Sequence, residues 1–302
     1  MRDTPFKRLA IEAFHRGGGL DAVRWFNRRG LRILMYHHFS DPAALASQCA
    51  HIRRHYNPVS ISRVGRWLKI GEPLPENPVA ITVDDGYRDF LTVAHPVFRE
   101  YGIPVTVFVV TDFLDGKLWL WVDRVQYAYR RANRPYEESR QMVESLKRLP
   151  NAERLSALAR LSASLGIVLP SEPPPEYRPL FWDEVRRLAA EGVEFGPHTM
   201  THPILSSISS VSEITREIAG SKRRLEDELG RPSVHFCYPN GSWHDIGEDA
   251  LSAVRASGFE TAVSTIPGLN SRPADPFLLR RIAADPALPE RYFHQLAAAF
   301  RV

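Results

Sequence analysis

Short apolar runs alternate with longer stretches of mixed polarity along most of the chain after Arg32. Unbroken runs of Val, Ile and Phe are typical of strands buried on both faces, whereas apolar residues spaced by three and four predict amphipathic helices. The predicted strands are 32–37, 79–85, 103–110, 193–198, 233–239 and 259–265. The predicted helices are 41–56, 87–101, 211–229 and 246–257, and the first begins with an Asp-Pro N-cap signal.

Strands that alternate with helices predict βαβ units and a parallel sheet. With six or seven such units, the pattern favours a closed or partly closed β/α barrel over an open doubly wound sheet. No G-x-G-x-x-G motif or P-loop is present, so nucleotide-binding variants of this architecture lose support.

The alternation stops at about 112–179, where LWLWVDRVQYAYRR, YEESRQMVESLKRL and the proline-rich PSEPPPEYRP follow one another. We interpret this stretch as a helical insertion on one rim of a single catalytic domain that spans 32–302. Residues 1–31 precede that domain and combine apolar residues with many arginines around Gly17-Gly18-Gly19. This basic amphipathic segment predicts short helices that either pack on the domain or attach peripherally to a membrane.

The composition is that of an ordinary globular protein: 302 residues, 44% hydrophobic and 25% charged, with a net charge of +4. This charge is too small to indicate nucleic-acid binding. Two cysteines, Cys49 and Cys237, make no disulfide framework. No apolar run is long enough for a spanning helix or a signal-peptide core, so we expect the cytoplasm or the cytoplasmic face of the membrane as the location.

Several predicted strands end in residues that carry chemistry. Asp84 and Asp85 end one strand, while His198, His37 and Tyr238 lie at the ends of three others. The carboxyl ends of barrel strands meet at one face, where functional residues gather. Two adjacent carboxylates repel each other unless a cation or a shared proton relieves the repulsion, so a cation site is expected nearby.

The segment G-P-H-T-M-T-H-P supplies two histidines four residues apart, His198 and His202. A metalloprotease would need Glu at position 199, which is Thr. Two histidines and one Asp make an open three-ligand site, which suits zinc best and also cobalt or nickel. One of the two aspartates would bind the ion, and Gly86 would allow the sharp turn that brings both to the mouth. The alternative is that the aspartates cap the next helix.

The motifs V-D-D-G-Y and H-T-M-T-H resemble the first two motifs of the polysaccharide deacetylase family, carbohydrate esterase family four, whose domain is like that of the nodulation deacetylases. The resemblance extends over about 32–282. It implies a distorted (β/α)7 barrel and metal-dependent removal of acetyl groups from sugars. It also implies that Asp84 is the catalytic base and that Asp85, His198 and His202 bind the metal.

In the third motif, F-C-Y-P-N-G, the resemblance implies that the backbone N–H of Tyr238 helps to stabilise the oxyanion, with Pro239 and Asn240 beside the substrate. This motif departs from the family, which has an Arg in place of Cys237 and an aromatic residue in place of Asn240. Arg281, in F-L-L-R-R-I, is expected to replace the missing Arg beside Asp84, with Arg280 as the alternative.

The late Leu-x-His of the family has no match, and His294 is expected at the surface. Instead L-M-Y-H-H occurs early and is similar to a circularly permuted subgroup, the exopolysaccharide poly-N-acetylglucosamine deacetylases. This similarity implies that His37 is the general acid, with His38 as the second candidate.

Aromatic residues of the insertion, Trp119 and Trp121, and also Trp182, are candidates for stacking on sugar rings, although core packing is the common use of such residues. Asp123 is a candidate polar contact at the rim. The sequence thus predicts a deacetylase of an N-acetylated surface polysaccharide or its lipid-linked precursor. An O-acetyl esterase and a non-catalytic carbohydrate-binding relative remain open, whereas adjacent carboxylates are poorly placed for a glycosidase.

Overall fold

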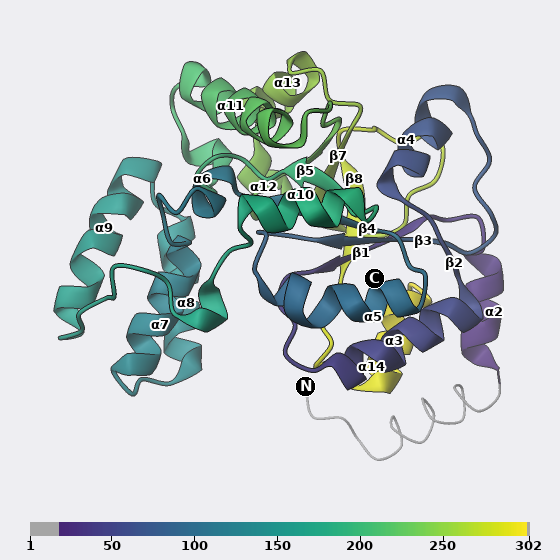
Figure 1. The fold of residues 1–302 in the computed structure, drawn as a ribbon, viewed down its shortest axis with the longest axis horizontal. Coiled ribbons are helices and arrows are strands. Elements are labelled where there is room, and N and C mark those ends of the chain that lie inside the picture. Colours follow the sequence, from purple (N-terminus) through teal and green to yellow (C-terminus); the bar gives the residue numbers. More distant parts are fainter. Residues whose placement is uncertain (1–17, 301–302) are drawn as a thin grey trace.

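The computed structural model describes residues 18–300, and seven parallel strands form a nearly closed barrel (Figure 1). The strands are β1 (Arg32–Tyr36), β3 (Pro78–Val83), β4 (Val105–Val109), β5 (Glu194–Pro197), β6 (His235–Cys237), β7 (Thr261–Pro267) and β8 (Leu279–Ala283). A two-residue strand, β2 (Asn57–Pro58), pairs with the start of β3. The last strand returns beside the first, with Leu34 opposite Ile282. The predicted distorted (β/α)7 barrel is confirmed.

The barrel closes between β5 and β6, the two ends of the sheet order. A Cβ atom added to Gly196 of β5 would lie 2.4 Å from the carbonyl oxygen of His235 in β6. The Ser233 hydroxyl also donates a hydrogen bond to the carbonyl of Phe195 at 3.3 Å. Only glycine fits at this close approach of two backbones, so closure depends on a residue without a side chain.

Helices surround the barrel on its outer side. They are α3 (Pro42–His55), α4 (Ile61–Ile70), α5 (His95–Glu100), α10 (Trp182–Ala190), α11 (Val211–Leu229), α13 (Glu248–Ala256) and α14 (Glu290–Ala297). The Asp41 side chain caps α3 by accepting from the N–H of Ala43 and Ala44, as the Asp-Pro signal predicts. Helix α11 has the predicted bounds.

Two helices differ from the sequence-based expectation. The predicted helix 246–257 corresponds to α13 (Glu248–Ala256), and Gly247, with a φ of 74°, separates it from an unpredicted short helix, α12 (Trp243–Ile246). The predicted helix 87–101 begins with a π-helical turn, Phe90–Ala94, and continues as α5. Helix α4, capped by Ser60, was not predicted, since it lies in a short connection between two strands.

Apolar side chains fill the barrel interior in a layer that crosses it. One buried cluster contains a residue from each of six strands: Ile33, Ala80, Phe108, Cys237, Val263 and Leu279. Residues of opposite parity, such as Leu34 and Ile81, belong to a second cluster together with residues of α3, α5 and α10. Both faces of the sheet are therefore buried, which agrees with the unbroken apolar runs of the sequence.

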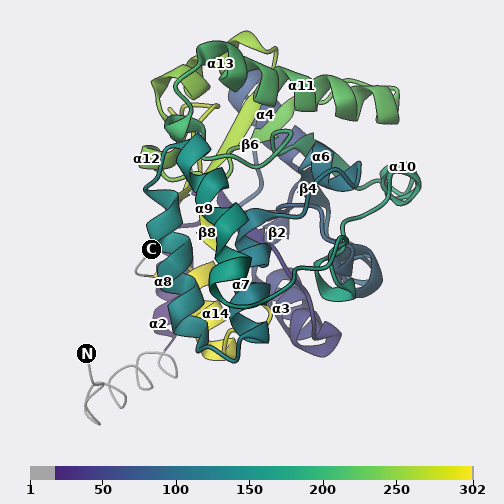
Figure 2. The ribbon, with the colours of Figure 1, turned by 90° about the vertical axis from the view of Figure 1, so that its left-hand side faces the viewer.

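The segment 112–179 stands beside the barrel as a small helical bundle (Figure 2). It contains α7 (Trp121–Arg131), α8 (Tyr136–Lys147), α9 (Asn151–Ser164) and a 3-10 turn (Pro175–Tyr177), and α6 (Thr111–Leu114) links it to β4. The bundle has its own buried cluster, which includes Val125, Val143 and Leu158, and Ile204 of the barrel side completes it. The division into 1–31, 32–302 and an insertion stays a prediction.

At the N-terminal side, α2 (Gly19–Phe26) buries Leu20 and Arg24 and exposes Trp25 and Phe26. The remaining amphipathic residues of this segment, Phe6 to Phe14, lie outside the described residues. Membrane attachment through this segment stays a prediction. Within 18–300, no helix has both the length and the apolar character needed to cross a membrane.

Candidate active site

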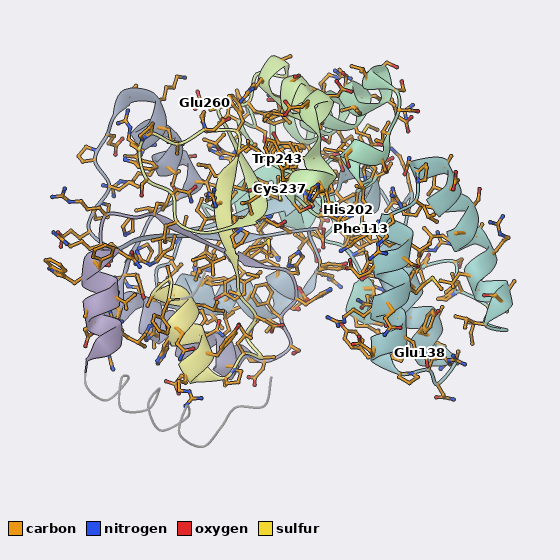
Figure 3. All side chains as sticks on the ribbon, turned by 180° about the vertical axis from the view of Figure 1, so that it is seen from behind. Phe113, Glu138, His202, Cys237, Trp243 and Glu260 are labelled. Atoms are coloured by element: carbon orange, nitrogen blue, oxygen red, sulfur yellow. The ribbon has the colours of Figure 1, made fainter. Side chains whose placement is uncertain are left out.

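The chemistry-bearing strand ends meet in one cavity on the side of the barrel that faces the helical insertion. Figure 3 shows His202 and Phe113 on that side. The cavity has a volume of about 380 Å³ and is lined from the barrel by Met35, His37, His38, Asp84, Asp85, Tyr87, His198, His202, Asn240 and Thr265. The structure thus brings together Asp84, Asp85, His198 and His37, which the sequence singled out at separate strand ends, whereas Tyr238 does not line the cavity.

Asp85, His198 and His202 form a compact, buried set of metal-type ligands. Asp85 Oδ1 lies 3.6 Å from Nε2 of His198 and 3.5 Å from Nε2 of His202. His198 Nδ1 lies 2.8 Å from the carbonyl oxygen of Cys237, an arrangement that leaves Nε2 as the free ligand atom. Asp85 Oδ1 is a buried atom without a hydrogen-bond partner in the described chain. A divalent cation would satisfy it.

The electrostatics of the three side chains also fit a cation. Burial, and then the neighbouring Asp84, raises the pKa of Asp85 well above its usual value. Burial lowers the pKa of His198 to about 4 and lowers the pKa of His202 well below its usual value. The imidazoles are therefore neutral, as metal ligands must be, and the carboxylate needs a positive charge to stay ionised. These residues fit a divalent ion of unspecified identity.

The loops that carry the ligands adopt left-handed backbone conformations. Asp85 has a φ of 72° and Gly86 a φ of 84°, so the turn after β3 includes one residue that pays a steric penalty. Thr199 and His202 also have positive φ, 68° and 57°. The Thr199 hydroxyl accepts a hydrogen bond from the N–H of His202 at 3.1 Å and stabilises this loop. Strain of this kind is concentrated at functional sites.

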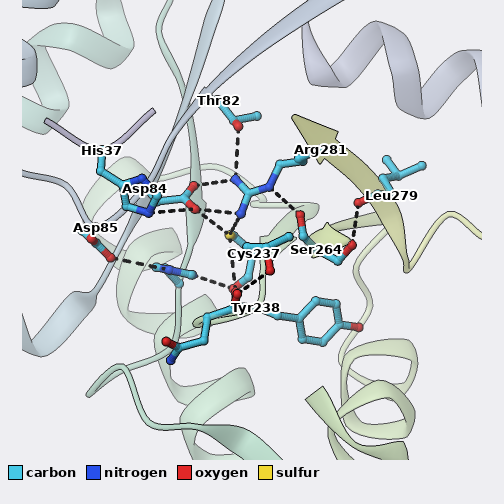
Figure 4. Close-up of polar contacts among 12 residues, drawn as sticks. His37, Thr82, Asp84, Asp85, Cys237, Tyr238, Ser264, Leu279 and Arg281 are labelled. Atoms are coloured by element: carbon cyan, nitrogen blue, oxygen red, sulfur yellow. Dashed lines mark hydrogen bonds and ion pairs between the residues drawn. The ribbon is translucent and has the colours of Figure 1, made fainter. Parts of the chain in front are cut away.

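Asp84 is held by Arg281 on the opposite side from the metal ligands. Figure 4 shows Asp84 with His37 on one side and Arg281 on the other. Both carboxylate oxygens accept from the guanidinium at 2.7 Å, and the thiol of Cys237 lies 3.2 Å from Nη2. Burial would raise the pKa of Asp84, but the charge and hydrogen bonds of Arg281 outweigh it and hold that pKa well below its usual range.

The adjacent carboxylates of Asp84 and Asp85 therefore interact with different partners. We expected a cation to relieve the repulsion between Asp84 and Asp85. The structure adds a buried guanidinium for Asp84, supplied by Arg281 of β8, which also contacts the thiol of Cys237. Arg280, the alternative, instead donates to the carbonyl of Pro267 at the surface.

His37 and His38 both line the cavity, with different neighbours. His37 Nε2 lies 3.9 Å from Asp84 Oδ2. His38 Nδ1 lies 2.9 Å from Asp89 Oδ2. Burial opposes the charged form of His38, but the hydrogen bond and charge of Asp89 outweigh it and raise the pKa. Only His37 is directed toward Asp84.

Two sequence-based expectations for the third motif need correction. The backbone N–H of Tyr238 donates to the carbonyl of Val263 at 3.2 Å, and its ring packs on Phe236, so this N–H is engaged in the sheet. Pro239 offers no N–H, and its carbonyl accepts from Gly241. Asn240 does line the cavity, and its Nδ2 is a buried donor without a partner in the described chain.

The candidate stacking aromatics do not line this cavity. Trp121 is buried in the core of the insertion, where Arg154 covers its ring. Trp119 packs against Tyr177, and Trp182 donates to Asp115. In each case the indole contacts a neighbouring protein side chain, as the core-packing alternative predicts. His294 of α14 stacks on His51 of α3, and neither residue lines the cavity.

Sequence reasoning missed several residues that shape the site. Glu217 of α11 accepts hydrogen bonds from the N–H groups of Met200 and Thr201 and from the Thr201 hydroxyl. Asp89 orients His38, and Tyr87 donates to Asp123. A glutamate in an amphipathic helix carries no sequence signal for this role, since its distance from the loop depends on how the helix packs.

The barrel thus carries a buried Asp-His-His set that fits a divalent cation, beside a second, ion-paired Asp. Residues 71–262 match the polysaccharide deacetylase family. The chain belongs to that family.

Individual relatives are distant. YxkH of Bacillus subtilis strain 168, named as a polysaccharide deacetylase, is 21% identical over 266 residues, which cover 85% of this chain and 72% of that protein. Poly-beta-1,6-N-acetyl-D-glucosamine N-deacetylase of Escherichia coli strain K12 is 36% identical over 74 residues, 24% of this chain and only 11% of that protein.

Solved structures share the fold. The Streptococcus pyogenes deacetylase PplD, in complex with acetate, has a TM-score of 0.63 at 19% identity and covers 89% of this chain and 99% of its own. IcaB from Ammonifex degensii has a TM-score of 0.62 at 18% identity, with coverage of 89% and 96%. These similarities show that the chain shares the barrel fold of these proteins. They do not show which substrate it uses.

Proposed function

We propose that this protein is a metal-dependent N-deacetylase that acts on N-acetylated sugar units of a surface polysaccharide or its precursor. The single observation that carries the proposal is the arrangement of Asp84. It lies in one cavity with the ligand set of Asp85, His198 and His202, and it is kept ionised by Arg281. An ionised carboxylate beside a cation site is suited to general-base hydrolysis.

Asp85, His198 and His202 would hold the ion, most favourably zinc, with cobalt or nickel as alternatives. When bound, such an ion supplies Lewis acidity that polarises the acetyl carbonyl and acidifies a water molecule. Asp84 takes the proton from the attacking water. Arg281 orients this carboxylate through two hydrogen bonds and prevents its protonation in the buried site. His37 delivers a proton to the leaving nitrogen.

Oxyanion stabilisation is assigned to a side chain instead of the Tyr238 backbone. The Asn240 amide nitrogen is buried, unpartnered in the described chain and part of the cavity lining. A donor left unsatisfied in the free protein costs energy that a developing oxyanion would recover. Asn240 therefore serves as the candidate donor in this proposal.

A glycan substrate is supported by the surface beside the cavity. A groove of about 980 Å³ shares Lys147, Asn240 and Thr265 with the cavity, and its further lining includes polar residues such as Ser206 and Ser242 as well as apolar ones such as Leu149 and Ile208. Hydroxyl and amide side chains suit the hydroxyl groups of neighbouring sugar units. The Escherichia coli relative is named a poly-beta-1,6-N-acetyl-D-glucosamine N-deacetylase, which supports the same substrate class.

An O-acetyl esterase is the second candidate, because it would use the same base and ligand set. The position of His37 beside Asp84 favours the amide, since an amine leaving group needs a proton more than an alkoxide does. A non-catalytic relative is disfavoured by Arg281, which occupies the place that the missing Arg of the third motif would otherwise leave empty.

The test is acetate release from oligomers of N-acetylglucosamine by the zinc-loaded protein and its Asp84→Asn variant. We expect the substitution to lower kcat at least about a hundredfold, the usual contribution of a general base, with zinc content unchanged. Asp275→Asn, which alters a surface ion pair with Arg255, is the matched control. Full activity of Asp84→Asn would reject the mechanism.

Asp84→Asn leaves Arg281 buried without its carboxylate, which can impair folding. His37→Gln provides an independent variant, because the His37 side chain is 45% exposed and Asp84 keeps its ion pair with Arg281. We expect His37→Gln to lower amide hydrolysis far more than hydrolysis of O-acetylated sugars. Equal losses on both substrates would contradict the assignment of His37 as the acid.

A further inference from the structure

The wall of the cavity opposite the strand ends comes from the helical insertion. It contains Leu120, Val122, Asp123, Gln126, Val143 and Lys147, all of which lie in or next to α7 and α8. Asp123 and Gln126 are three residues apart in α7 and therefore lie on one face of the helix. The catalytic residues described above all come from the barrel, so this polar face has no role in that mechanism.

Asp123 is a carboxylate with only one of its oxygens used by the protein. Its side chain is buried, with 3% of the residue exposed. Oδ2 accepts a hydrogen bond from the hydroxyl of Tyr87 at 2.7 Å. Oδ1 has no hydrogen-bond partner within residues 18–300. It is also not one of the partnerless atoms that are fully enclosed by protein. Oδ1 is thus an acceptor that opens onto the cavity.

Gln126 repeats this situation one helical turn further along. It is half-buried, and its amide group has no hydrogen-bond partner in the described part of the chain. Leu120, Val122 and Val143 supply apolar surface around these two polar groups, and Lys147 completes the wall. A sugar ring has apolar C–H faces and hydroxyl groups at its rim, and it is complementary to a wall of this mixed kind. Buried polar groups without partners in the free protein are typical of ligand sites.

Cavity size limits the ligand to one sugar residue at this position. The volume of about 380 Å³ lies near the lower end of the range for small-molecule sites, roughly 300–1,000 Å³. The adjoining groove would then take the rest of a chain. The residue in the cavity is the one whose acetyl group reaches Asp84.

We propose that Asp123 and Gln126 form a sugar-recognition site that binds the ring hydroxyls of the N-acetylhexosamine undergoing deacetylation. This inference rests on the proposed function for the identity of the ligand. Asp123 accepts from a hydroxyl, Gln126 bonds to a second ring substituent, and the apolar wall contacts the ring face. The insertion thereby determines which acetylated sugar is positioned at the barrel chemistry.

Tyr87 distinguishes recognition from a purely structural role of Asp123. The Tyr87 hydroxyl connects the loop after Asp85 to α7, so Tyr87→Phe breaks this structural tie, whereas Asp123→Asn can keep it. A sugar contact through Oδ1 is lost only in Asp123→Asn, where an amide can replace the outward-facing oxygen while its carbonyl still accepts from Tyr87.

Binding is measured first, in the Asp84→Asn background, by titration calorimetry of zinc-loaded protein with the trimer of N-acetylglucosamine. We expect Asp123→Asn to raise Kd by roughly 10- to 100-fold, as for loss of a hydrogen bond to a charged group, and Gln126→Ala to raise it about 3- to 10-fold. Arg131→Ala, an exposed position of the same helix, is the control and should leave Kd unchanged. An unchanged Kd in Asp123→Asn overturns the proposal.

Turnover is measured second, with Asp84 intact, on the trimer and on p-nitrophenyl acetate, an ester without a sugar. We expect Asp123→Asn to raise KM for the trimer and to leave hydrolysis of the ester and zinc affinity unchanged. Equal losses on both substrates, or weaker zinc binding, would overturn the recognition role.

The two measurements separate this inference from the proposed function. If the wild-type protein binds the trimer but releases no acetate from it, the proposed function fails. A weaker Kd in Asp123→Asn would then still support the sugar site. If neither the wild-type protein nor the Asp84→Asn variant binds the trimer, the recognition proposal fails, whatever the activity on other acetylated compounds.

Discussion

The barrel mouth and the helical insertion face each other across one cavity, and they differ in how their polar groups are satisfied. At the mouth, Asp84 is paired with Arg281, and His198 is bonded to the backbone of Cys237. On the insertion wall, Gln126 and one oxygen of Asp123 have no partner within residues 18–300. The mouth also holds atoms without partners in the described chain, Asp85 Oδ1 and Asn240 Nδ2, which the proposed ion and oxyanion would satisfy. The polar groups of the wall would instead be satisfied by the proposed sugar.

The origin of this difference is the kind of structure that carries each side. The strand ends of the barrel are positioned by ladder hydrogen bonds to neighbouring strands and by packing on both faces, so charged groups can be held at fixed distances. The insertion depends on a small separate core around Val125 and Leu158. Changes at the mouth should therefore abolish the reaction, and changes in the insertion should alter binding.

The largest effect is expected when the mouth loses its metal. Treatment with a chelator should reduce acetate release to the background, and added Zn²⁺, Co²⁺ or Ni²⁺ should restore it. His202→Ala should remove zinc binding, since two ligands hold a catalytic ion poorly. Metal content measured by mass spectrometry provides the check, with His294→Ala, a histidine of α14, as the control.

If the chelator-treated protein kept full activity, the proposed difference between a metal-binding barrel mouth and a sugar-binding insertion wall would be contradicted. A His202→Ala variant that retains stoichiometric zinc would locate the ion outside the set of Asp85, His198 and His202.

An intermediate effect is expected from Glu217, which acts behind the mouth. Its carboxylate holds the loop of Met200 and Thr201 through three hydrogen bonds, at 3.0, 2.9 and 2.8 Å. Partners of metal-binding groups usually contribute 10- to 100-fold to metal affinity. We expect Glu217→Ala to weaken zinc binding by about this factor, measured by competition with a chelating dye.

Glu217→Gln should recover part of that loss, because its carbonyl can accept at least one of the three hydrogen bonds. Glu213→Ala, in the first turn of the same helix, is the control. If Glu217→Ala and the control bind zinc equally, the loop is held by its own backbone and not by α11.

The smallest effect on chemistry is expected from the core of the insertion. Leu158 of α9 is 3% exposed, and Leu158→Ala should cost about 2–5 kcal/mol of local stability. Hydrogen exchange should become faster for amides of α7 to α9, with those of β1, β3 and β4 unchanged. Zinc affinity should not change, while binding of N-acetylglucosamine oligomers should weaken.

Uniformly faster exchange in the barrel and the insertion would show that the two regions unfold together. The comparison between a rigid mouth and a separate wall would then have to be abandoned. Leu155→Ala, at an exposed position of α9, is the control for a change of size without burial.

The sequence predicted much of this arrangement because its strongest signals are local. Apolar strands, an Asp-Pro cap and histidines at a fixed spacing can be recognised without knowing what lies beside them. The predictions that need correction depended on contacts. Whether the N–H of Tyr238 is available depends on Val263, which is paired with it across β6 and β7. Whether Trp121 reaches a sugar depends on how α7 packs.

By itself, the sequence determined the barrel class, the residues at its strand ends and the types of ligand they offer, since these follow from periodicity and side-chain chemistry. Only the tertiary structure decided that Arg281 and not Arg280 reaches Asp84, that Glu217 supports the loop of Met200 and Thr201, and that Asp123 opens onto the cavity. These pairs are far apart in the chain, and their distances are set by the closure of the barrel at Gly196 and the packing of helices around it.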